Sequence, residues 1–249
     1  SKSKSSTKKK FKLELSDIKL KNFRHFRDKR ETGVREYYYV QDGSVKVEQM
    51  NFPANYILLN SVNLKGPAVL ISHDPNVIPP ESKAILDSVY SCTNPFVIFI
   101  KKANLEKGYF AFDRTGNVVF EEQGKDHVDF KHFSVDEIEG SLSNFFYSDF
   151  ESNGVLHELK ARLNNKMRIQ SFKAGKIDVS NNKTTLENFT LETDRSFVGD
   201  SLYLTYGSYK DFKNFNNRVF LQLVAKSNTV NLDEVKYFSP SLANNAFFT

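Results

Sequence analysis

The sequence predicts an α+β fold, predominantly antiparallel β, with about three short helices and two β-rich segments around a central helical stretch. Short apolar runs and alternating patterns, which are typical of strands, fill both ends of the 249-residue chain. Apolar residues at helical spacing are concentrated between residues 134 and 165. Strands do not alternate regularly with helices, so a doubly wound parallel sheet is not expected.

Shifts in composition divide the chain into four parts. Residues 1–10, SKSKSSTKKK, form a low-complexity basic arm that cannot bury apolar surface and is expected to be flexible. Residues 11–133 form a β-rich segment with one short helix, and residues 134–165 form the helical stretch. Residues 166–249 form a second β-rich segment with an extended C-terminal tail. Residues 11–249 are also compatible with one single domain.

The first β-rich segment contains the clearest strand signals. Residues 96–100, FVIFI, are an unbroken apolar run that predicts a strand buried on both faces, with Phe99 in the core. Gly108 is expected to open a further strand over residues 109–113, which pairs with residues 118–122. Asp42 and Gly43 lie between two strand candidates and predict a tight hairpin turn.

Weaker patterns complete this segment. Pro80 is expected to begin a short helix over residues 81–90, because proline is favoured at the first helical position. The further strand candidates, which show alternating or continuous apolar residues, are 11–15, 37–40, 45–49, 56–59 and 68–71.

Residues 134–165 carry the two central helix predictions. Ser134 and Glu137 have the spacing of a capping box, and apolar residues follow at helical spacing through residue 146. A further helix is expected from Val155 to residue 163, with Leu156 and Leu159 on its apolar side.

In the second β-rich segment, strands are expected to be separated by turns at Gly175, Asn181–Asn182 and Gly207. The predicted strands are 167–172, 176–179, 186–191, 202–206, 219–225 and a last one around 235–238. Residues 239–249 contain Phe247 and Phe248 and no charged side chain, so this tail is expected to dock on its own body or on a neighbouring copy.

The charge distribution provides the main functional signal. The net charge is +5, much of the excess lies in the arm, and the chain outside the arm is nearly neutral. Residues 21–35 form a second basic block. Flexible cations neutralise phosphates, and Phe23 and Phe26 could stack on unpaired bases between them. In the competing interpretation the arm is a solubilising tail, and the two phenylalanines are core residues. The candidate nucleic-acid-binding residues are Lys2, Lys4, Lys8, Lys9, Lys10, Lys21, Arg24, Arg27, Lys29 and Arg30.

These features favour a non-enzymatic structural or assembly protein that binds nucleic acid or another polyanion. A basic arm on a β-rich body is similar in layout to virion-shell and nucleoprotein-like components, and the apolar tail suits self-association. The alternative is a metal-dependent nuclease that uses Asp149, Glu158 and Lys160, because an acid-x-Lys pair after a carboxylate can bind Mg²⁺. No catalytic residue, metal site or cofactor is otherwise predicted, since the five histidines lack metal-ligand spacing.

Cysteine usage and hydropathy predict the compartment. The single Cys92 rules out an intrachain disulfide and fits a reducing environment. No apolar run approaches the roughly 18 residues of a membrane span, and no signal peptide is recognised. The expected location is therefore intracellular or within a virion.

Overall fold

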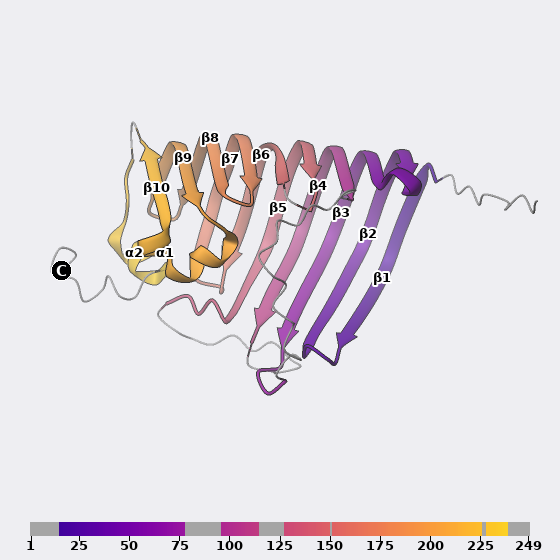
Figure 1. The fold of residues 1–249 in the computed structure, drawn as a ribbon, viewed down its shortest axis with the longest axis horizontal. Coiled ribbons are helices and arrows are strands. Elements are labelled where there is room, and N and C mark those ends of the chain that lie inside the picture. The colour runs from indigo at the N-terminus through magenta and orange to yellow at the C-terminus, as the bar shows by residue number, and fades with distance from the viewer. Residues whose placement is uncertain (1–14, 78–95, 115–126, 150, 226–227, 239–249) are drawn as a thin grey trace, which may run out of the picture.

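One long sheet forms the protein, as the computed structural model shows (Figure 1). The structure describes residues 15–77, 96–114, 127–149, 151–225 and 228–238. Ten strands lie side by side in chain order from β1 to β10. Their bounds are β1 Asp17–Lys29, β2 Val34–Asn51, β3 Tyr56–His73, β4 Val97–Asp113, β5 His132–Tyr147, β6 Glu151–Leu163, β7 Met167–Ser180, β8 Lys183–Thr193, β9 Phe197–Tyr206 and β10 Val219–Val224.

All neighbouring strands are antiparallel except β3 and β4, which run parallel. Within the described ranges, the helical elements are short: η1 (Phe52–Ala54), η2 (Tyr209–Asn214), α1 (Phe215–Arg218) and α2 (Leu232–Phe238). The β-rich character predicted from the sequence is confirmed. The α+β class with about three helices is wrong, because the protein is nearly all β.

Both central helix predictions are wrong, and β-bulges are the physical reason. Residues 132–147 form β5, and residues 151–163 form β6. In β5 the pairing register shifts around Glu137 and Asn144, which both have positive φ (49° and 51°). A bulge inserts one residue, so side chains on one face are separated by three positions instead of two. Val135 and Ile138 therefore share a face although their spacing resembles that of a helix.

Two predicted strand breaks are also wrong. β2 runs through Asp42 and Gly43 without a turn, and β4 runs through Gly108 as one strand. Gly43 and Gly108 are needed for space, not for a turn. A Cβ at Gly43 would lie 3.1 Å from Leu64 Cδ2, and a Cβ at Gly108 would lie 2.7 Å from Leu105 Cδ2.

These contacts show the direction in which the sheet bends. In a straight strand, positions three residues apart are separated by about 10 Å. Leu105 and Gly108 nevertheless meet on one side of β4, so the strand curves toward that side. Positive φ angles at Gly66, Lys107 and Glu137 mark the bend on three successive strands. Figure 1 shows the strands curving over along the upper edge. We call the side toward which they curve the inner face.

The remaining strand predictions have mixed outcomes. The 219–225 strand is confirmed as β10, whereas 235–238 belongs to helix α2. The candidates 167–172 and 176–179 are parts of the single strand β7. Phe99 lies in β4 but is only partly buried, so its strand is not covered on both faces. Several predicted segments lie outside the described residues: the arm 1–10, the helix 81–90, the strand 118–122 and the tail 239–249. Of the predicted strand 11–15, only residue 15 is described.

Candidate functional site: the apolar inner face of the sheet

The inner face is apolar along rows that cross the strands. Directly paired residues lie on the same face of a sheet, so the pairing register traces each row. One row runs from β1 to β9 through Leu20, Gly43, Leu64, Leu105, Gly140, Leu159, Phe172, Leu191 and Val198. A second row runs through Ile18, Val45, Val62, Ala103, Leu142, Leu156, Ala174 and Phe189. The first row contains no charged residue, and the second contains none as far as β8; on β9 Asp200 pairs with Phe189.

The opposite, outer face carries polar side chains on the strand positions between these two rows. The row between the two inner rows consists of Lys19, Ser44, Asn63, Asn104, Ser141 and Glu158. Side chains of this row form hydrogen bonds across strands. For example, Asn104 Nδ2 donates a hydrogen bond to Asn63 Oδ1 at 2.8 Å. The sheet is thus strongly amphipathic, and the inner face requires cover from water.

Helical elements cover this face at the C-terminal end of the sheet. Rings of Tyr209 and Phe212 in η2 lie 5.6 and 4.8 Å from the ring of Tyr206, measured between centroids. The buried apolar side chains concentrate in this part, on strands β6 to β9: Ala161, Met167, Ala174, Phe189 and Tyr206.

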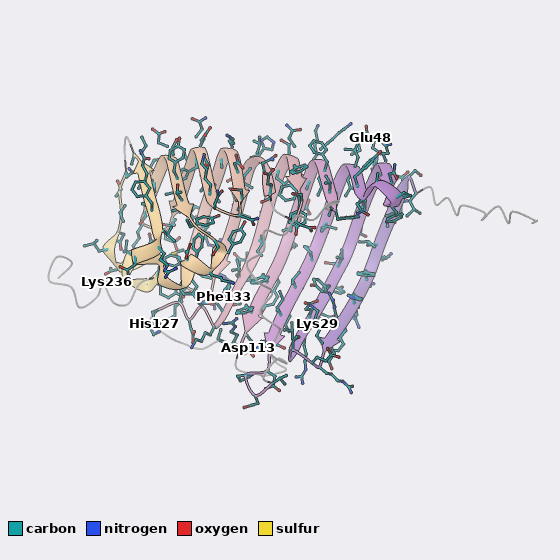
Figure 2. The ribbon with its side chains drawn as sticks, in the orientation of Figure 1. Lys29, Glu48, Asp113, His127, Phe133 and Lys236 are labelled. Atoms are coloured by element: carbon teal, nitrogen blue, oxygen red, sulfur yellow. The ribbon has the colours of Figure 1, made fainter. Side chains whose placement is uncertain are left out.

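Helix α2 is held against the turns at the ends of β6 and β8. Thr193 Oγ1 donates to Glu234 Oε2 at 2.6 Å, and the backbone N–H of Arg195 donates to Glu234 Oε1 at 3.2 Å. Tyr237 accepts a hydrogen bond from Asn164 Nδ2 through its hydroxyl, at 3.2 Å. Lys236 marks the helix in Figure 2, at the lower left of the sheet, on the same lower side as Phe133 and Asp113.

On strands β1 to β5 no apolar side chain of the two rows is fully buried, whereas Ala174 and Phe189 are buried on β7 and β8. The other row members on β6 to β9, such as Leu159, are partly exposed as well. Leu20, Val45, Leu64, Leu105 and Leu142 are all partly exposed. Among the described residues, η2 and α2 make hydrogen bonds and ring contacts with residues such as Tyr206, Thr193, Asn164 and Val128, which lie outside the rows of β1 to β5. A small apolar hollow of about 70 Å³ lies where this part begins, lined among others by Leu142, Phe145 and Leu156. This apolar stretch is the candidate site.

Two larger hollows, of about 480 and 500 Å³, lie on the outer face and are lined by both charged and apolar residues. Some of their charged groups are paired with neighbours, and Glu158 is the clearest case. Ser171 Oγ donates to Glu158 Oε1 at 2.7 Å, and the Lys173 ammonium lies 3.4 Å from Glu158 Oε2. Burial acts to raise the pKa of the Glu158 carboxyl, but these two partners outweigh it and hold the pKa below its ordinary value. The carboxylate of Glu158 is therefore satisfied by groups of the neighbouring strand β7.

A buried contact between a histidine and an aspartate joins the ends of β4 and β5. His132 Nδ1 lies 3.0 Å from Asp113 Oδ1, and both side chains are at most 2% exposed. The pairing register places the two residues directly opposite each other. Because both are inaccessible, the pair holds these strand ends together and offers no surface for a substrate.

The predicted nucleic-acid-binding residues are only partly in the described chain. The five lysines of the arm, Lys2, Lys4, Lys8, Lys9 and Lys10, lie outside it. The others lie on β1 and the turn after it, where alternation sends them to both faces. Three of them lie near carboxylates.

Lys29 Nζ lies 2.8 Å from Glu36, Arg27 lies 3.6 Å from the same carboxylate, and Arg30 lies 3.5 Å from Asp28. Lys21 and Arg24 share the outer side of β1 with Phe26, which is 60% exposed. Binding of a polyanion by these residues stays a prediction, but the structure does not gather them on one surface.

The nuclease residues are not brought together either. Glu158 and Lys160 lie on the same face in the middle of β6, whereas Asp149 precedes the strand. Seven residues of extended chain separate Glu151 from Glu158, which is about 23 Å. Among the described residues, no group of three or more histidine, cysteine, aspartate or glutamate side chains could hold a metal ion.

The sequence analysis missed the inner face on β5 and β6 because its apolar positions there were assigned to helices. At some of the three-residue steps an Asn with positive φ gave a signal, for example Asn144 between Leu142 and Phe145. Comparison with known proteins finds no matching family model and no matching curated protein. Among the described helices, none is long and apolar enough to cross a membrane.

Proposed function

We propose that this protein binds a long apolar chain, of the fatty-acyl type, along the inner face of strands β1 to β5. The observation that supports this proposal most strongly is the partial exposure of two continuous apolar rows on that part of the sheet, directly opposite a polar outer row. An apolar sheet face in water is stable only when another apolar layer covers it. An acyl chain supplies such a layer.

The shape of the site favours an elongated ligand. The rows run across the strands, and neighbouring strands are about 4.8 Å apart, so four intervals from β1 to β5 span about 19 Å. The two rows are close together, since Leu64 and Val62 are only two positions apart on β3. A narrow apolar strip of this length matches an extended hydrocarbon chain better than a compact ring system.

The chemistry of the rows favours a hydrocarbon over a polar polymer. From β1 to β5 the two rows consist of Leu, Ile, Val, Ala and Gly residues, which offer the ligand no side-chain hydrogen bond. Binding energy must then come from removal of apolar surface from water, about 0.8 kcal/mol for each buried methylene. Affinity is thus expected to depend on chain length and hardly on salt.

A displacement titration with saturated fatty acids of increasing length tests this function. Each added methylene is expected to tighten binding about fourfold, which corresponds to about 0.8 kcal/mol, until the chain is longer than the site. The measurement is the loss of fluorescence of a bound polyene fatty acid below the micelle concentration. Absence of binding, or an affinity that does not change with chain length, would contradict the proposal.

A further inference from the structure

The outer edge of β10 leaves backbone groups directed away from the sheet. The backbone N–H of Tyr206 donates to Asn182 O on the β8 side, so the Tyr206 backbone groups point away from β10. Val219 pairs with Tyr206, and its own N–H and C=O must therefore point to the open side, as must those of Leu221 and Leu223. Among the described residues, β9 is the only strand that pairs with β10.

The side chains of β10 are apolar and exposed. The strand reads VFLQLV and carries no charge, and four of its side chains are among the exposed large apolar residues. Their exposed fractions are 68% for Phe220, 48% for Leu221, 45% for Leu223 and 40% for Val224. An uncharged apolar edge strand is a template for pairing with another strand.

The opposite edge of the sheet has the features that prevent such pairing. β1 carries five lysines and arginines between Asp17 and Lys29, directed to both faces. Asn22 in its middle has a φ of 49°, which interrupts the regular edge. Charges and irregular backbone on an edge strand disfavour association. The two edges therefore differ, and only β10 is suited to accept a partner strand.

We propose that β10 pairs antiparallel with β10 of a second copy of this chain, around a two-fold axis at Gln222. This register places Leu221 opposite Leu223 of the partner subunit and Phe220 opposite Val224 of the partner subunit. Each side chain then meets one from the same face of the sheet, as antiparallel pairing requires. The two Leu pairs use backbone groups that point outward and form four interchain hydrogen bonds.

Two observations favour β10 of a second copy, and not another strand, as the partner of β10. The strand is self-complementary, because the only polar residue lies at the centre and apolar residues flank it on both sides. The dimer also continues the inner face, since Leu221 and Leu223 pair with Leu204 and Leu202 of β9. A β10–β1 contact would instead leave one free edge at each end and produce open polymers.

Cysteine cross-linking tests the register directly, in a chain in which Cys92 is replaced by serine. In this register Gln222 lies opposite Gln222 of the partner subunit, as a pair without hydrogen bonds between their backbones. The Cα separation of such a pair is about 4.5 Å, which is within the disulfide range. Gln222→Cys is expected to form a covalent dimer under copper–phenanthroline oxidation. Phe220→Cys alone is expected to remain uncross-linked, but to cross-link when mixed with Val224→Cys.

Light scattering after size exclusion tests the assembly itself. The unmodified chain is expected to have twice the monomer mass, and the double variant Leu221→Lys, Leu223→Lys is expected to have the monomer mass. Phe26→Lys on β1 is the matched control and should leave the dimer intact. Far-UV circular dichroism distinguishes dissociation from unfolding. A monomeric unmodified chain, a series of larger polymers, or cross-linking of Phe220→Cys alone would overturn the proposal.

Discussion

Replacement of Phe189 with alanine is expected to lower the free energy of unfolding by about 3–5 kcal/mol. Phe189 lies in β8 on the inner face and is only 4% exposed. Its ring packs edge-on against Phe172, with 6.5 Å between the ring centroids. The part of the sheet around it contains most of the buried apolar residues, so a cavity left there cannot close easily.

Equilibrium unfolding in urea measures this loss, provided that the dependence of the free energy on urea concentration stays the same. Phe26→Ala is the matched control, because Phe26 lies on the edge strand β1 and is 60% exposed. Its removal is expected to change stability by no more than about 0.5 kcal/mol. Equal losses in the two variants would show that the stability of the protein is not concentrated in the β6–β9 part.

Replacement of Leu105 with aspartate is expected to weaken fatty-acid binding by at least about a hundredfold. Leu105 lies in the inner row between Leu64 and Gly140, in the middle of the proposed site. An acyl chain on this row would have to remove a carboxylate from water, and the effective cost of burying an unpaired ion is several kcal/mol. A loss of 2.7 kcal/mol already corresponds to a hundredfold change.

Asn104→Asp is the control for this variant, since it adds the same charge at the next position of β4 but on the outer face. Its affinity is expected to stay within about twofold of the unmodified protein. Ala103→Phe provides a second test without a charge, because a large ring on the inner row occupies the space of the ligand. Similar losses in Leu105→Asp and Asn104→Asp would indicate a nonspecific charge effect and contradict the site.

The β-rich character was predictable from the sequence, but the number of strands was not, because the bulges change the spacing of the apolar residues. A regular strand repeats every two residues, but each bulge adds one position. Leu156 and Leu159 share the inner face for this reason, as do Leu186 and Phe189 on either side of Asn188, which has a φ of 51°. On short windows this spacing cannot be distinguished from that of a helix turn.

The candidate site was not predictable for a related reason. A row across the sheet joins single residues from strands far apart in sequence, such as Leu20 and Leu159, and only the pairing register identifies it. The turn predicted at Asp42 and Gly43 failed because local turn chemistry does not report the neighbouring Leu64 side chain that needs the space of a Cβ. Strand 219–225 was predicted well, since β10 contains no bulge and has six consecutive paired residues.

Photoaffinity labelling tests the central claim, that an acyl chain lies on the inner face of β1 to β5, most directly. The protein is irradiated with a fatty acid that carries a diazirine near its methyl end, and labelled residues are identified by fragmentation in a mass spectrometer. Labels are expected on inner-row residues such as Leu64, Leu105 and Leu142, and an excess of unlabelled fatty acid should prevent them. Labels on the outer row at Asn63, Asn104 and Ser141, or labels that unlabelled fatty acid does not reduce, would contradict the account.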